Sequence, residues 1–114
     1  MSYVFEIDDV TVWSPALRVG QVFQGYVKVL EAALHVPSGV DEWASDFLVL
    51  DRTKFTAFTE ELEQWTLGGH SVVRDLAGPV LAICLVMLER AGRPVDPELA
   101  QQLDLPRVGA GMPT

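Results

Sequence analysis

Cysteine and histidine are scarce in this chain of 114 residues, which has one cysteine, Cys84, and two histidines, His35 and His70. A single cysteine excludes an internal disulfide, and none of these residues has the paired spacing of a zinc site. Acidic residues could still hold Mg²⁺ or Ca²⁺, but no EF-hand spacing is present, so we expect no metal. Cys84 lies in the apolar run from Pro79 to Leu88, which predicts a buried thiol in a reducing, cytoplasmic location.

Basic residues are few, because eight Lys and Arg stand against 16 Asp and Glu, for a net charge of −8. Proteins that bind phosphate backbones need clustered bases, so nucleic acid is not an expected partner. The excess of acid would suit a cationic partner, although solubility alone also explains it.

Long apolar runs, a basic start and catalytic motifs are absent as well. The longest apolar run covers about ten residues, whereas a membrane span needs roughly 20. Glu6 stands near the start, where a secretory signal would carry bases. The sequence contains no nucleophile elbow, P-loop or dinucleotide-binding loop. We therefore expect no secretory signal, no membrane insertion and no cofactor.

What the chain does have is apolar residues, which make up 49% of it. A domain of this size has too little interior to cover so much apolar surface. A homodimer that buries part of this surface, with two-fold symmetry, is the simplest expectation.

Short β-rich segments predict a small antiparallel sheet. Residues 3–7 and 10–13 alternate around Asp8-Asp9 and predict a hairpin. A loop should follow the first helix from residue 37 to about 46. Residues 47–50 are continuously apolar and predict a strand with both faces buried.

Apolar periodicity and capping residues predict three to four helices, so the fold class is α+β and mostly α. The expected helices begin at Ser14-Pro15, Asp51, Ser71 and Asp96, and they end before Pro37, at Gly68-Gly69, at Gly92 and near Leu103. Residues 1–105 should form one compact domain, with a flexible tail over 106–114.

Three residues inside these helices oppose helix formation. Gly20 and Gly25 each cost about 1 kcal/mol relative to Ala, so crowded packing or a close approach by another backbone or ligand should offset them. Pro79 should kink or split the third helix near Gly78. The segment after it is apolar on every side, which predicts a central core helix or a dimer seam.

The best catalytic candidates are His70 and Arg74, at the start of the third helix, with Ser71 beside them as a binding residue. The helix dipole would lower the pKa of His70, and the neutral imidazole could act as a base. Arg74 could hold a carboxylate. The alternative is that His70 and Arg74 join the glycine turn to the helix through backbone hydrogen bonds.

Trp13, Trp43 and Trp65 are candidates to line an apolar binding cleft, although tryptophans more often belong to the core. Acids such as Asp41, Glu42 and Glu60 could dock a cationic peptide, or they could simply form a solvated surface.

An ordered set of short motifs resembles a family of short actinobacterial proteins of uncharacterised function. The motifs are Trp13-Ser14-Pro15, Val19-Gly20 with Phe23, Val36-Pro37-Ser38-Gly39, Asp51 with Phe55 and Phe58, His70 through Arg74, and Leu85 through Arg90. Within that family, the chain is similar to the small lysinoalanine-forming proteins of the cinnamycin and duramycin lantibiotic clusters.

The resemblance implies an aza-Michael addition, in which a lysine amine of a lanthipeptide precursor adds to a dehydroalanine. Because dehydroalanine is already electrophilic, holding the two groups close together can supply several kcal/mol of the barrier. The alternative is a non-catalytic acidic interaction protein, such as an immunity protein that neutralises a basic toxin.

Overall fold

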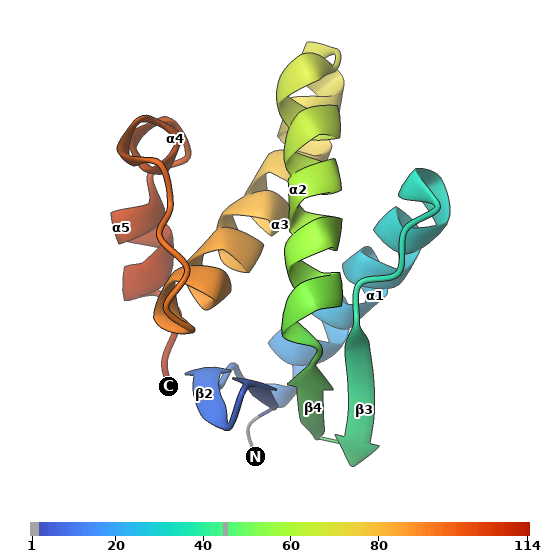
Figure 1. Ribbon diagram of the computed structural model, residues 1–114, viewed down its shortest axis with the longest axis vertical. Helices are drawn as coiled ribbons and strands as arrows, with labels where there is room; N and C mark the ends of the chain where they lie inside the picture. Colours follow the sequence, from blue (N-terminus) through green and yellow to red (C-terminus); the bar gives the residue numbers. More distant parts are fainter. Residues whose placement is uncertain (1–2, 45) are drawn as a thin grey trace.

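The computed structural model describes residues 3–44 and 46–114, with the side chains of all of these except Trp43 and Ala44. Four strands form one sheet at one end of the molecule, and the helices rise from it (Figure 1). The elements in chain order are β1 (Val4–Ile7), β2 (Val10–Trp13), α1 (Leu17–Leu34), β3 (Val40–Ala44), β4 (Phe47–Leu50), α2 (Arg52–Gly68), α3 (Ser71–Arg90), α4 (Pro97–Gln102) and α5 (Leu105–Ala110). The α+β, mostly α class is confirmed.

The sheet differs from the expected antiparallel one because it is mixed. Its strand order is β2-β1-β4-β3, and the central pair β1 and β4 is parallel. Helix α1 and strand β3 form the crossover that parallel neighbours require. The expected loop over residues 37–46 is wrong in part, because β3 pairs there with β4. Because Asp41 and Glu42 are exposed acids, this edge strand lacks the apolar alternation from which strands are predicted.

The predicted hairpin is confirmed, with Ile7 paired to Val10 across a two-residue turn. Asp8 and Asp9 have φ of 50° and 65°. Positive φ at both central residues is typical of a type I′ turn, which matches the twist of the strands and which Asp tolerates.

Helix α1 begins later than predicted. Ala16 is its N-cap and makes no side-chain cap bond, whereas Ser14 is bonded to the C-terminal segment, its N–H donating to the Pro113 carbonyl at 2.6 Å. Ser14, the predicted N-cap, therefore bonds to the C-terminal segment and does not cap the helix. The predicted stop before Pro37 is confirmed, and His35 closes the helix in the left-handed conformation.

Strand β4 is buried on one face rather than both. Leu48 and Leu50 are buried, but Val49 between them is 36% exposed. The burial of β1 alternates in the same way, because the helices cover a single face of the sheet. Asp51 follows β4 and caps α2 as predicted, accepting a hydrogen bond from the Lys54 N–H at 2.9 Å.

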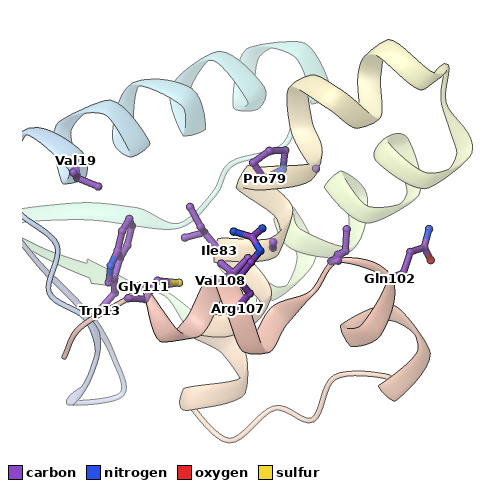
Figure 2. Close-up of a pocket in the computed structure, with 12 residues that line it drawn as sticks. Trp13, Val19, Pro79, Ile83, Gln102, Arg107, Val108 and Gly111 are labelled. Atoms are coloured by element: carbon purple, nitrogen blue, oxygen red, sulfur yellow. The ribbon is translucent and has the colours of Figure 1, made fainter.

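Helix α3 is the central helix of the core, as its apolar segment predicted. Its interior residues from Val80 to Leu88 are buried except for the partly buried Ile83. Pro79 bends the helix without dividing it (Figure 2). By length and composition α3 could cross a membrane, but 56% of that stretch is buried inside the protein, as in a core helix.

The N-cap of α3 is His70, not Ser71. The Nδ1 atom of His70 accepts a 3.3 Å hydrogen bond from the Val72 N–H, so the imidazole takes the capping position one residue earlier. Gly92 ends the helix as predicted, with φ of +96° and the Arg93 N–H donating to the Leu88 carbonyl.

The segment after residue 105, which we expected to be a flexible tail, is packed onto α3. Helix α5 begins at Leu105, and both Leu105 and Met112 are buried. The carbonyl of Gly109 accepts a hydrogen bond from Arg90 of α3 at 3.0 Å. Glycine and proline predicted fraying, but buried apolar contacts order this segment.

Two glycines of α1 should respond in opposite ways to substitution by alanine. A Cβ on Gly20 would lie 2.6 Å from the Tyr3 Cβ, whereas a Cβ on Gly25 would meet nothing within 4 Å. We expect Gly20→Ala to destabilise the fold by about 1–3 kcal/mol through overpacking. Gly25→Ala should stabilise it by about 1 kcal/mol. Urea unfolding of both variants at low protein concentration measures this, and equal effects would contradict it.

Candidate functional site

The structure places His70, Ser71 and Arg74 together at the N-terminus of α3, beside the turn from α2, where all three are exposed. The Arg74 guanidinium donates to the Leu67 carbonyl at 3.1 Å, and His70 caps α3. These are the backbone hydrogen bonds expected if His70 and Arg74 have the structural role of joining the glycine turn to the helix. The turn lies at the opposite end of the molecule from the sheet, and none of the three lines a cavity described below (Figure 1).

The three predicted cleft tryptophans do not form one site. Trp13 is buried at 3% exposure, whereas Trp65 is 39% exposed on α2. The side chain of Trp43 lies outside the described residues. Trp13 is therefore the one member of the predicted set that the structure places in a cavity.

Two adjoining hollows meet at Trp13 and form one apolar groove. The first has a volume of about 560 Å³ and lies between α3 and the α4–α5 segment. The second, of about 280 Å³, lies between α1 and α3. Both are lined by Trp13, Val19, Pro79 and Ile83, so we call these four residues the groove floor. Trp13, Ile83 and Val108 gather between α3 and α5, with Val19 across from them on α1 (Figure 2).

The groove continues onto apolar surface that the chain leaves uncovered. On α1, Val19, Val22 and Tyr26 are 51%, 59% and 52% exposed, and on α3 Leu76 is 66% exposed. Large apolar residues gathered at a cleft are typical of a binding surface rather than of random surface exposure. A volume of several hundred Å³ is also in the usual range of ligand pockets.

Trp13 places a hydrogen-bond donor, its indole N–H, beside the groove. Its indole Nε1 is buried and has no hydrogen-bond partner among the described residues. A buried donor without an acceptor costs about 1–3 kcal/mol. The ring itself is held by an aromatic cluster, because it stacks on Phe5 at 5.3 Å and meets Phe23 edge-on at 5.2 Å.

Arg90 fixes the elements that surround this tryptophan. From α3, its guanidinium donates to the Val12 carbonyl of β2 at 2.9 Å and to the Gly109 carbonyl of α5 at 3.0 Å. The strand that carries Trp13, the helix that carries Ile83 and the helix that carries Val108 are thereby joined through one partly buried side chain.

One charged side chain lines each of the two hollows. Asp75 of α3 lines the smaller hollow, and Arg107 of α5 lines the larger one. Among the residues that line the two hollows, Asp75 is the acid and Arg107 is the base. Nearly all of the 16 acids of the chain therefore lie outside the groove.

Cys84 stands apart from the groove as a fully buried side chain of α3. Burial raises the pKa of its thiol to about 12, and the Thr59 hydroxyl opposes this rise in part. The thiol therefore stays protonated and unreactive near neutral pH. Within the described part of the chain, no three His, Cys, Asp or Glu side chains come together as a metal site.

Sequence reasoning missed most of the groove because the apolar residues of α1 recur at helical spacing. That pattern alone does not separate the exposed Val19, Val22 and Tyr26 from the buried Phe23 and Val27. An available signal was the width of that apolar stripe, which exceeds what one buried helix face can hold. Arg107 and Gly111 fell in the segment assigned to a tail.

The structure thus contains an apolar groove with one acid in its smaller hollow and one base in its larger hollow. Residues 1–112 match a family of unknown function, DUF6086, and the chain belongs to this family. Comparisons with curated proteins and with solved structures find no match.

Loss of the Arg90 clamp should loosen the groove before it unfolds the core. We expect Arg90→Met to cost about 2 kcal/mol, because two carbonyls lose a charged donor while the apolar part of the side chain is kept. Hydrogen exchange should rise in β2 and α5 but not in α2. Arg74→Met, which removes an exposed hydrogen bond on the opposite end, is the control, and uniform exchange across both variants would contradict the prediction.

Proposed function

We propose that this protein binds an apolar peptide segment in the groove around Trp13 and holds it for a reaction of the peptide itself. The observation that carries the proposal is the continuity of the two hollows with the exposed apolar residues of α1 and α3. A peptide seated there would cover this surface. With a small turn of the indole, a peptide carbonyl could also accept the Trp13 N–H.

The resemblance to lysinoalanine-forming proteins supplies the reaction for this proposal. A lysine amine of a lanthipeptide precursor attacks the β-carbon of a dehydroalanine, the C–N bond forms as the C=C π bond breaks, and the α-carbon gains a proton. The proton lost from the nitrogen balances the one gained by carbon, so no atom is lost and no cofactor is consumed. Positioning within about 3–3.5 Å is the main requirement, which an apolar groove can meet.

We propose that a second copy of the chain packs against the exposed face of α1 that lies beyond the groove. Beyond the groove, Val29 is 66% exposed, and Gly25 faces open space on the same side of the helix. Among the described residues, no atom lies within 4 Å of a Cβ built on Gly25, whereas a helix of a second copy could approach it closely. Residues 17–30 contain the bases Arg18 and Lys28 and no acid, so this face avoids the repulsion that a charge of −8 creates elsewhere.

The peptide proposal is tested with a cinnamycin-type precursor that has its thioether rings and a free dehydroalanine. A thiol reagent adds to unreacted dehydroalanine, so bridge closure should abolish trapping when the protein is present. We expect Val19→Asn combined with Leu76→Asn to weaken peptide binding about tenfold, since two apolar contacts are lost. Both positions are exposed, so the fold should persist.

Val10→Asn is the matched control, because Val10 is 46% exposed and does not line the groove. Trapping that continues although the peptide is bound would refute the reaction and leave the binding function. Absence of binding by the wild-type protein would refute both. Binding of a basic protein that weakens steeply with salt would favour the immunity alternative.

The second-copy proposal is tested by a cysteine at Gly25, because Cys84 is buried and stays reduced. We expect Gly25→Cys to form a disulfide-linked dimer under mild copper-phenanthroline oxidation. The control Thr53→Cys, on the exposed surface of α2, should not do so. Sedimentation should give twice the chain mass of 12.5 kDa for the wild type and a monomer for Val29→Glu. A wild-type monomer at all concentrations would refute the dimer.

A further inference from the structure

The two hollows of the groove carry opposite charges, because Asp75 lines the smaller one and Arg107 the larger one, and this polarity points to the chemistry of the occupant. Resting on the proposed function, we propose that the groove selects an apolar peptide with a basic side chain beside Asp75 in the smaller hollow and a carboxylate beside Arg107 in the larger one. Asp75 and Arg107 are then specificity residues of the same site.

Asp75 is available to a ligand. It is exposed on α3 beside Leu76, and no ion pair reaches it within the described residues. Its neighbour Arg74 does not neutralise it closely, because that guanidinium is directed to the Leu67 carbonyl at the end of α2. A lysine or arginine of a peptide would therefore meet an unpaired carboxylate at the rim.

Arg107 is the corresponding cation in the larger hollow of the groove. Its Nε donates to Asp104 at 3.0 Å, which leaves the terminal nitrogens of the guanidinium for a second carboxylate. The side chain extends from α5 toward α3 (Figure 2). Gln102 lines the same hollow and adds an amide that could bond to a peptide backbone. Arg90 does not compete for this role, since it is bonded to two backbone carbonyls.

The length of the groove limits the peptide. From Asp75 to Ile83, α3 advances eight residues, which at 1.5 Å each is about 12 Å. An extended peptide spans this distance with about four residues, so about six residues cover it with one to spare on each side. The groove floor shared by the two hollows is apolar, so the residues between the two charges should be apolar too. A uniformly basic peptide would be repelled by Arg107 and a uniformly acidic one by Asp75.

Three synthetic peptides of about six residues test the charge polarity against an uncharged parent. The parent is acetylated, begins with norleucine, continues with apolar residues and ends in an amide. The first derivative replaces norleucine by lysine, the second has a free C-terminal carboxylate, and the third is an amide whose last residue is glutamate. Affinities are measured by calorimetry at low salt with the wild-type protein.

We expect lysine and each carboxylate to tighten binding about threefold over the parent, as is usual for exposed ion pairs. Asp75→Asn should abolish the gain from lysine, whereas the neighbouring Arg74→Gln should keep it. Arg107→Gln should abolish the gain from the carboxylate, whereas Arg93→Gln should keep it. A gain from one carboxylate peptide but not from the other would identify the C-terminus or the side chain as its source.

The outcomes separate this inference from the function on which it depends. If the parent binds and the charges change nothing, or if the gains survive Asp75→Asn and Arg107→Gln, the charge polarity is refuted while the peptide groove stands. If neither the parent nor its derivatives bind, both proposals are refuted.

Discussion

The two hydrogen bonds of Arg90 hold together three of the elements that surround the groove, β2, α3 and α5. This guanidinium reaches from α3 to the carbonyl of Val12 in β2 and to that of Gly109 in α5. Both carbonyls belong to short elements, because β2 has four residues and α5 has six. A planar donor with several N–H groups can satisfy both at once, which a lysine ammonium cannot do with the same geometry. These two bonds act together with the aromatic cluster around Trp13 and the buried apolar residues of both elements.

The core and the groove use the same apolar surface in different ways. Helix α3 is surrounded by protein along Val80 to Leu88, which makes it the centre of the fold, yet one side of its first half remains open at Leu76 and Pro79. Pro79 bends the helix where the open part meets the buried part. Helix α1 is divided in a similar way, with Phe23 and Val27 buried and Val22 and Tyr26 exposed. Uncovered apolar surface costs solubility, and this cost is the reason for which we propose a bound partner.

Much of the fold could be predicted from local patterns. The hairpin followed from alternating residues around Asp8-Asp9, the start of α2 from Asp51, and the central position of α3 from its continuous apolar segment. Strand β3 could not be predicted, because an exposed acidic edge strand has no apolar alternation and is stabilised by its pairing with β4. The cap at Ser14 failed for a related reason, since the C-terminal segment binds that residue instead.

The candidate site, like the fold, could be predicted only in part from the sequence. Trp13 was among the predicted cleft residues, whereas His70, Ser71 and Arg74 form an exposed turn at the far end of the molecule. The sequence by itself determined the first four helices, their stops, the acidic balance and the excess of apolar residues, because these depend on composition and on contacts between near neighbours. Only the tertiary structure decided that residues 105–110 form a fifth helix, that Arg90 joins β2 to α5, and that Asp75 and Arg107 line the two hollows of one groove. Those pairings join residues about 20 to 80 positions apart, and side-chain packing over such separations leaves no periodic trace in a single chain.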